Sequence, residues 1–316
     1  MGLDLLDTPV RLTWDLHGPG EPLDRAELLA IAGRIAAAGV FFVTLEERPL
    51  AHPAIGALLA ELAAGGCQLQ ALCAGSATEL AAFDQGPLPL AALQFDVAAF
   101  TAGGALDADG VRATLDRLRR NGYEVTVQLT PLRSNLQVIP RLLALCRECG
   151  VGRFKLPNAR IGATFRSIPP EELPRWPDLE TFRAEWSRQV PEFPGTPQLE
   201  IHDRFLWEIM TPGFDQVRSE YGGCQAANSL GHVDATGTVY ACAAWPEALG
   251  SLRSASLDVI WQSLRRLDVR ARIGQVPAGC HDCRDYPVCL GGCRGLGELL
   301  GRAAGGRDLM CRAPRG

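Results

Sequence analysis

The residues best suited to chemistry in this chain are its cysteines, because seven of the eleven lie between residues 224 and 311. Their spacing is Cys224-x17-Cys242, then Cys280-x2-Cys283-x5-Cys289-x3-Cys293, and finally Cys311. Thiolates at such short intervals are soft ligands that hold iron–sulfur clusters or zinc. The two-residue gap between Cys280 and Cys283 lets both sulfur atoms face one metal centre, and Gly291 and Gly292 let the chain turn before the next cysteine.

This spacing resembles the cysteine signature of the SPASM domain, the auxiliary iron–sulfur module of many radical S-adenosylmethionine (SAM) enzymes. The resemblance covers roughly residues 222–312 and includes the linking stretches 249–253 and 256–261. It implies two [4Fe-4S] clusters. By this resemblance, auxiliary cluster I would be held by Cys224, Cys242 and Cys293, and auxiliary cluster II by Cys280, Cys283, Cys289 and Cys311.

The implied set of ligands is one short, because two four-iron clusters want eight ligands and the signature supplies seven. Some family members provide the missing cysteine just ahead of the first motif, but residues 218–223 contain none. We therefore expect cluster I to have an iron atom that is open, or bound by oxygen, nitrogen or a partner. Zinc is the alternative metal for paired Cys-x2-Cys motifs, and it would make the domain a structural scaffold.

Composition indicates an ordinary globular chain with no affinity for nucleic acid or membrane. Its 316 residues, 47% of them hydrophobic, can bury a substantial core. A net charge of −5 argues against a nucleic-acid binder, and no apolar stretch reaches membrane-spanning length. The first residues lack the features of a signal peptide, so we expect the protein in the reducing cytoplasm. Two domains are expected, at residues 1–205 and 206–316.

The first 205 residues alternate between strand-like and helix-like stretches, which is typical of parallel βα units. Asp24 and Glu27 can form a capping box that opens a helix over 25–38. Strands are expected at 11–16, 41–45, 69–73, 93–97, 124–129, 153–156 and 198–202, and further helices at 54–64, 111–121, 136–149 and ahead of the last strand. The fold class predicted is α/β: a partial (β/α)6-type TIM-like barrel, followed by a small cysteine-rich α+β SPASM domain. A hairpin with a glycine turn is expected at 231–240, where it would fix Cys242.

The barrel region resembles a radical SAM partial barrel, but it departs from that family at both SAM-binding motifs. The family's first strand leads into a loop bearing Cys-x3-Cys-x2-Cys, whereas residues 17–22 contain no cysteine. After the second strand, the family's Gly-Gly-Glu-Pro is replaced by Glu46-Glu47-Arg48-Pro49. The two glutamates put side chains where backbone should approach SAM, and Arg48 reverses the charge facing its ammonium. We therefore expect neither SAM binding nor SAM cleavage.

The stretches 201–207 and 222–229 resemble the GeoRSP-system SPASM-domain group, degenerate paralogues that accompany a true radical SAM/SPASM enzyme. This resemblance implies an iron–sulfur accessory protein that assists a peptide-modifying partner by electron relay, docking or peptide binding. Its partners would be the radical SAM/SPASM enzyme and a small peptide-chaperone-like protein or a precursor peptide. Two other functions stay open at this point: an enzyme that binds substrate at the open iron of cluster I, and a zinc-bound structural scaffold.

Several further residues have a chemical and a structural interpretation. Core packing is favoured for Cys146, which lies with Cys149 near the end of an expected helix, and for the thiols of Cys67 and Cys73. A hydrogen-bonded structural pair is favoured for His202 and Asp203 at the end of a barrel strand, and support of the fold for Trp14 and Asp15. The histidines next to the cysteine motifs, His232 and His281, are candidates for tuning or ligating iron.

Overall fold

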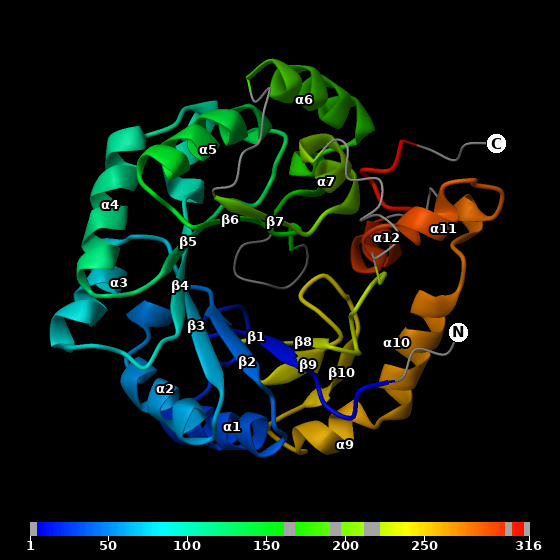
Figure 1. Cartoon of the computed structure of the whole chain (residues 1–316). Coiled ribbons are helices and arrows are strands. Elements are labelled where there is room, and N and C mark those ends of the chain that lie inside the picture. Colours follow the sequence, from blue (N-terminus) through cyan, green and yellow to red (C-terminus); the bar gives the residue numbers. More distant parts are fainter. Residues whose placement is uncertain (1–4, 161–167, 190–196, 212–221, 301–304, 313–316) are drawn as a thin grey trace.

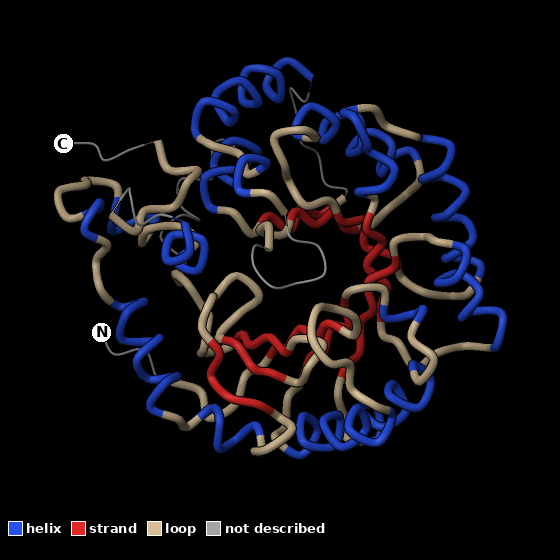
Figure 2. The backbone as a smooth tube through the Cα atoms, turned by 180° about the vertical axis from the view of Figure 1, so that it is seen from behind, coloured by secondary structure: helices blue, strands red, loops and turns tan. Residues whose placement is uncertain are grey.

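A computed structural model describes residues 5–160, 168–189, 197–211, 222–300 and 305–312. Its strands form one curved sheet in the order β10-β9-β8-β1-β2-β3-β4-β5-β6-β7. The strands from β1 to β7 are parallel neighbours along this sheet, and the helices between them lie outside it (Figures 1 and 2). This is the expected architecture of an α/β partial barrel.

The strands have the following bounds: β1 Arg11–Asp15, β2 Phe42–Glu46, β3 Gln68–Cys73, β4 Ala92–Asp96, β5 Val125–Gln128, β6 Arg153–Leu156, β7 Gln198–Ile201, β8 Leu230–Val233, β9 Thr238–Tyr240 and β10 Ala248–Ser251. The α-helices are α1 Arg25–Ala37, α2 Ile55–Ala64, α3 Ala77–Ala81, α4 Ala108–Arg120, α5 Ile139–Glu148, α6 Trp176–Gln189, α7 Arg204–Met210, α9 Leu257–Trp261, α10 Leu264–Gly274, α11 Tyr286–Cys289 and α12 Arg294–Leu300. All seven strands expected in the barrel are present, and no bound differs from the expected one by more than one residue.

Local sequence signals account for the first helix. The Asp24 carboxylate accepts a hydrogen bond from the Glu27 backbone N–H at 2.8 Å, and the Glu27 carboxylate accepts one from the Asp24 N–H at 3.0 Å. This confirms the capping box predicted from the sequence. A second capping box, between Ser76 and Glu79, opens the five-residue helix α3, which is too short to leave a helical period in the sequence.

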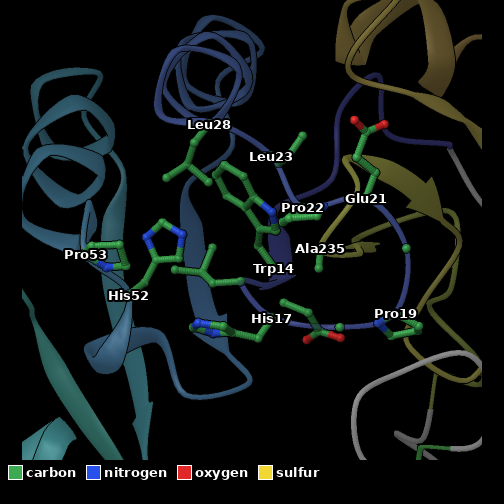
Figure 3. Close-up of a pocket in the computed structure, with 14 residues that line it drawn as sticks. Trp14, His17, Pro19, Glu21, Pro22, Leu23, Leu28, His52, Pro53 and Ala235 are labelled. Atoms are coloured by element: carbon green, nitrogen blue, oxygen red, sulfur yellow. The ribbon is translucent and has the colours of Figure 1, made fainter.

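The two faces of the barrel strands differ in chemistry. Along β1, Leu12 and Trp14 are fully buried, and Trp14 lies against Leu28 of α1 (Figure 3). On the opposite face of the sheet, the Gln94 amide N–H donates to Gln70 at 2.6 Å, and the Lys155 ammonium donates to Gln94 at 2.9 Å. Because successive residues of a strand point to opposite faces, the helix-covered face is apolar and the inner face of the barrel is polar.

The cysteine-rich segment continues the barrel sheet. Strand β8 pairs in parallel with β1, with Leu12 opposite Gly231. Strands β8 and β9 then form an antiparallel hairpin, and Gly237 in its turn has a φ of +83°, which confirms the predicted hairpin with a glycine turn. The elements from α10 to α12 lie where the two edges of the sheet, β10 and β7, face each other (Figure 1). The domain boundary at residue 205 stays a prediction, and α7 runs across it.

No helix in the described parts of the chain is both long and apolar enough to cross a membrane.

The seam between β1 and β8 generates a stability prediction. A Cβ atom on Gly231 would lie 2.9 Å from a Leu12 methyl and 3.2 Å from the Trp261 ring, and both side chains are fully buried. We expect Gly231→Ala to lower the free energy of unfolding by about 1–3 kcal/mol through overpacking. Gly152→Ala is the matched control, because a Cβ there meets nothing within 4 Å. Urea denaturation of both variants checks this, and equal losses would contradict it.

Candidate functional site

The turn between Cys289 and Cys293 is built from left-handed backbone. Leu290, Gly291 and Gly292 have φ angles of +49°, +83° and +68°. A Cβ on Gly292 would lie 2.6 Å from the Asp308 carboxylate and 2.9 Å from the Phe205 ring. Glycine is therefore required at this position, both for the conformation and for the close approach.

Four of the motif cysteines line one small cavity. Its wall contains Cys280, Cys283, Cys289 and Cys311, together with Phe205, Gly279, Tyr286, Gly291, Arg307 and Asp308. Burial, followed by the charges of the other three cysteines, raises the pKa of Cys280 to about 11. The same two effects, burial and neighbouring thiolates, raise the pKa of Cys289. Neutral thiols do not repel one another in this way, but thiolates this close together would. The positive charge of a bound metal centre would offset that repulsion and hold the coordinating sulfur atoms deprotonated.

The other three motif cysteines interact among themselves. Burial, followed by the charge of Cys224, raises the pKa of Cys242 to about 12. The pKa of Cys293 is raised well above its usual value by burial, then by Asp308, Cys242 and Cys224. Four of the seven cysteines (the group of four) thus share a cavity, and the other three (the group of three) affect one another electrostatically; the assignment of these two groups to clusters stays a prediction.

Helix α10 and the residues after the cysteine turn hold the group of three in place. The buried guanidinium of Arg270 donates to the carbonyls of Cys224 and Ala226 at 2.8 and 2.9 Å. Arg294 donates to the carbonyls of Arg272 and Ile273 at the end of α10, and to the carbonyl of Gln275 just after it. Burial raises the pKa of Cys224, and the positive charges of Arg270 and Arg294 oppose that rise. Positive charge next to a thiolate favours its metal-binding form.

One carboxylate joins the two cysteine groups. Asp308 is buried and accepts hydrogen bonds from the backbone N–H groups of Cys293, at 2.6 Å, and of Met310, at 2.8 Å. Cys293 belongs to the group of three, and Met310 precedes Cys311 of the group of four. Burial raises the pKa of Asp308 to about 6, against the effect of these two hydrogen bonds. The link fixes how the two groups lie relative to each other.

The donor set fits an iron–sulfur cluster. All donors in the group of four are cysteines, and the backbone N–H groups of Ala244 and Trp245 hydrogen-bond to Cys242 in the group of three. Thiolate ligands with hydrogen bonds to sulfur are what such clusters use. Within the described residues, no three His, Cys, Asp or Glu side chains lie close enough to hold a single metal ion. The case for a metal centre therefore rests on two observations. Four cysteines share one cavity, and the charges of the other three cysteines affect one another's pKa values.

A separate pocket of about 320 Å³ lies under the loop that follows β1 (Figure 3). Its wall includes residues 14–23, Leu28, His52, Pro53 and Ala235, and no cysteine. His17 hydrogen-bonds to the Glu47 carbonyl at 2.9 Å, and its ring meets that of His52 edge-on at 5.5 Å. Burial, followed by the charge of His17, lowers the pKa of His52.

The turn after β2 has left-handed backbone, which glycine usually adopts, although no glycine is present there. Glu47 and Arg48 have φ angles of +54° and +53°, which cost energy for residues with side chains and persist where the surrounding structure enforces them. Glu46 is buried, as is Glu47, whereas Arg48 is exposed. The prediction that these glutamates occupy the space of a SAM ligand stays a prediction.

At the ends of β1 and β2, buried polar side chains from distant parts of the chain meet. Asp15 is paired with Arg160 at 2.7 Å, and the same guanidinium is paired with Glu46. His232, on β8, hydrogen-bonds through Nδ1 to the Thr13 hydroxyl at 2.8 Å. Its Nε2 atom lies 3.5 Å from the Asp15 carboxylate. His232 is therefore engaged with β1 rather than with the cysteines, although it was a candidate for tuning iron.

The remaining candidates divide between core and surface. Cys67, Cys73 and Cys146 are buried as predicted, and burial is the main reason that the pKa values of Cys73 and Cys146 rise to about 12. Asp203 caps α7 by accepting a hydrogen bond from the Leu206 N–H at 2.8 Å, whereas His202 is exposed. His281 is also exposed.

Comparison with known proteins identifies a cysteine-rich domain and a fold. Residues 224–284 match the family model of SPASM, an iron–sulfur cluster-binding domain. The fold is similar to that of Streptococcus suis SuiB bound to S-adenosylmethionine, with 14% identity and a TM-score of 0.67 over 98% of this chain and 78% of SuiB. SuiB bound to its precursor peptide SuiA gives 13% identity and a TM-score of 0.65 over 97% of this chain and 76% of that one. The protein anSMEcpe with bound AdoMet gives 12% identity and a TM-score of 0.63, over 91% and 89% of the two chains.

These comparisons define the class of protein. The chain has the α/β parallel sheet of a partial TIM barrel, like that of radical SAM enzymes, followed by a SPASM iron–sulfur domain. No curated protein sequence matches it significantly.

Sequence reasoning missed three residues that organise the site: Arg160, Arg270 and Asp308. Each acts across a long separation in the chain, and none lies in a recognisable motif. The only sequence signal was that Asp308 lies three residues before Cys311. That position does not reveal the hydrogen bond between Asp308 and the backbone of Cys293.

The buried imidazole of His232 generates a prediction about pH. Burial lowers its pKa to about 4, and the charge of Arg160 also acts in that direction. Between pH 6.5 and about 4 the unfolded chain takes up a proton that the folded protein does not, so stability falls as the pH falls through this range. The loss from this residue should reach about 3 kcal/mol. We expect His232→Asn to lose less stability than the wild type between pH 6.5 and 4.5 in urea denaturation. Identical slopes would contradict this.

Proposed function

We propose that this protein is an iron–sulfur accessory protein that assists a radical SAM/SPASM peptide-modifying partner and does not cleave SAM itself. The observation that carries the proposal is a contrast between the two halves of the chain. Seven cysteines gather in two groups in the SPASM domain, while the loop after β1 contains no cysteine.

The two cysteine groups support two [4Fe-4S] clusters. Auxiliary cluster II would take Cys280, Cys283, Cys289 and Cys311, which share one cavity. Auxiliary cluster I would take Cys224, Cys242 and Cys293, with a fourth ligand from outside the cysteines. When bound, such clusters supply one-electron transfer. The chain's own residues set the environment: Arg270 and Arg294 place positive charge beside cluster I, and Asp308 fixes the separation of the two groups.

The barrel supports the second half of the proposal, the loss of SAM chemistry. A cluster that binds SAM needs three thiolates at the loop after β1, and the side chains present there include His17 and Glu21, which do not suit a four-iron centre. The turn after β2 carries Glu46 and Glu47, both buried, in the space where glycines would admit a ligand.

Peptide binding is the third part of the proposal. SuiB has been solved with its precursor peptide SuiA. The protein anSMEcpe has been solved with the Cp18Cys peptide, and that anSMEcpe structure matches this chain with 13% identity and a TM-score of 0.61. A chain with this fold and without SAM chemistry fits a role that presents a precursor peptide, docks a small peptide-chaperone-like protein, or relays electrons to the enzyme. We place it in the cytoplasm, where thiols stay reduced, with domains at residues 1–205 and 206–316.

Metal analysis tests the clusters. We expect about eight iron and eight sulfide per chain in anaerobically purified protein, because each cluster contains four of each. Cys280→Ser should reduce both to about four. Cys146→Ser is the matched control, since that cysteine is buried in the barrel core, and it should keep the full content. Zinc in place of iron would contradict the proposal and favour a structural scaffold.

A binding and turnover experiment tests the accessory role. We expect isothermal titration to detect no SAM binding at micromolar concentrations, since the cysteines that would ligate its cluster are missing from the loop after β1. Turnover of the radical SAM/SPASM partner should rise when this protein is added, and the Cys280→Ser variant should raise it less. Micromolar SAM affinity, or a partner whose rate and product are unaffected by addition, would contradict the accessory role.

A further inference from the structure

Two carboxylates are buried side by side at the carboxyl ends of β1 and β2. Asp15 and Glu46 are register partners in the parallel pair, and they are 2% and 7% exposed. Removing two like charges from water is costly unless a cation compensates them. In this structure the cation belongs to the chain itself: one nitrogen of the Arg160 guanidinium lies 2.7 Å from Asp15, and the other is paired with Glu46.

Arg160 reaches this place from the far side of the barrel. It follows β6, which is five strands away from β1 in the sheet. Its side chain is 19% exposed. Because β6 and β1 are so far apart along the curved sheet, the side chain must bridge the carboxyl end of the barrel. Neither a helix nor a strand contains Arg160, so the ion pairs are what fixes its position.

A third buried side chain faces the acidic pair. His232 presents Nε2 at 3.5 Å from the second Asp15 oxygen, and this buried nitrogen makes no hydrogen bond. Its ring is held by Thr13 through the other nitrogen. Among the described residues, Arg160 is the only arginine or lysine that pairs with either carboxylate. The site therefore consists of two acids, a fixed imidazole and one cation that is replaceable in principle.

We propose that Asp15 and Glu46 form a binding site for a guanidinium group, and that Arg160 is its built-in occupant. Two carboxylates on adjacent strands match the two outward N–H pairs of a guanidinium, which is the geometry that favours arginine over lysine. While Arg160 occupies the site, a free cationic ligand is excluded from the carboxyl end of the barrel. This goes beyond the proposed accessory function, because it depends on neither the clusters nor the partner.

The test removes the occupant and offers a substitute of the same chemistry. In anaerobically purified full-length Arg160→Ala, methylguanidinium chloride at about 10 mM should raise the melting temperature by several degrees, because a ligand that binds only the folded state stabilises it. Sodium chloride at the same ionic strength and urea at the same concentration should not. Isothermal titration should show at least tenfold tighter methylguanidinium binding to the variant than to the wild type.

Two control variants make the result specific. The first is Arg112→Ala, whose guanidinium pairs with Glu148 at the surface; it should not respond to methylguanidinium. The second is the neutral triple variant Asp15→Asn/Glu46→Gln/Arg160→Met, which has lost the acids and should also fail to respond. Arg160→Met retains most of the side-chain volume and replaces Arg160→Ala if that variant does not fold. Arg160→Ala and Arg160→Met can each be tested as purified or after refolding with methylguanidinium. If methylguanidinium raises the melting temperature of neither variant more than that of Arg112→Ala, the proposal is overturned.

Discussion

The repulsion between thiolates gathered in a buried place is the interaction on which the cysteine-rich half of this protein depends. Seven cysteines approach one another in two groups, and burial raises the pKa of each member for which a shift is resolved. Neighbouring thiolate charge adds to the rise for Cys242, Cys280, Cys289 and Cys293. The fold provides part of the compensation. Arg270 and Arg294 supply positive charge next to Cys224, and backbone N–H groups hydrogen-bond to Cys242. With iron bound in both groups, as we propose, the positive charge of each metal centre would supply the rest of the compensation.

The barrel also buries negatively charged groups, but there a side chain of the protein compensates their charge. Its inner face holds Asp15 and Glu46, and Arg160 provides the cation. The two halves are mechanically continuous, since β8 of the cysteine-rich segment pairs with β1 of the barrel. His232 on β8 contacts Thr13 on β1. The guanidinium of Arg160 also lies close enough to Cys242 to lower the pKa of that thiol, against the larger effect of burial. The end of the barrel and the group of three cysteines thus share one electrostatic environment.

Much of this architecture could be predicted from the sequence because it is encoded locally. Period-two and helical patterns located the seven barrel strands, and the Asp24–Glu27 box located the start of α1. The spacing of the cysteines was enough to expect the SPASM domain. The sequence did not predict contacts between residues far apart in the chain, such as Arg160 with Asp15, which are 145 positions apart. It also did not show that Glu47 and Arg48 keep left-handed backbone, since neither is a glycine.

The central claim is that the two cysteine groups hold two separate iron–sulfur clusters, one of which lacks a fourth cysteine. Mössbauer spectroscopy of anaerobically purified, ⁵⁷Fe-enriched protein tests it most directly, because the spectrum distinguishes iron sites by their ligands. The account predicts one cluster with four equivalent thiolate-bound iron sites, and a second cluster in which one iron differs from the other three. A spectrum with a single fully thiolate-bound cluster, or with mononuclear iron alone, would contradict it.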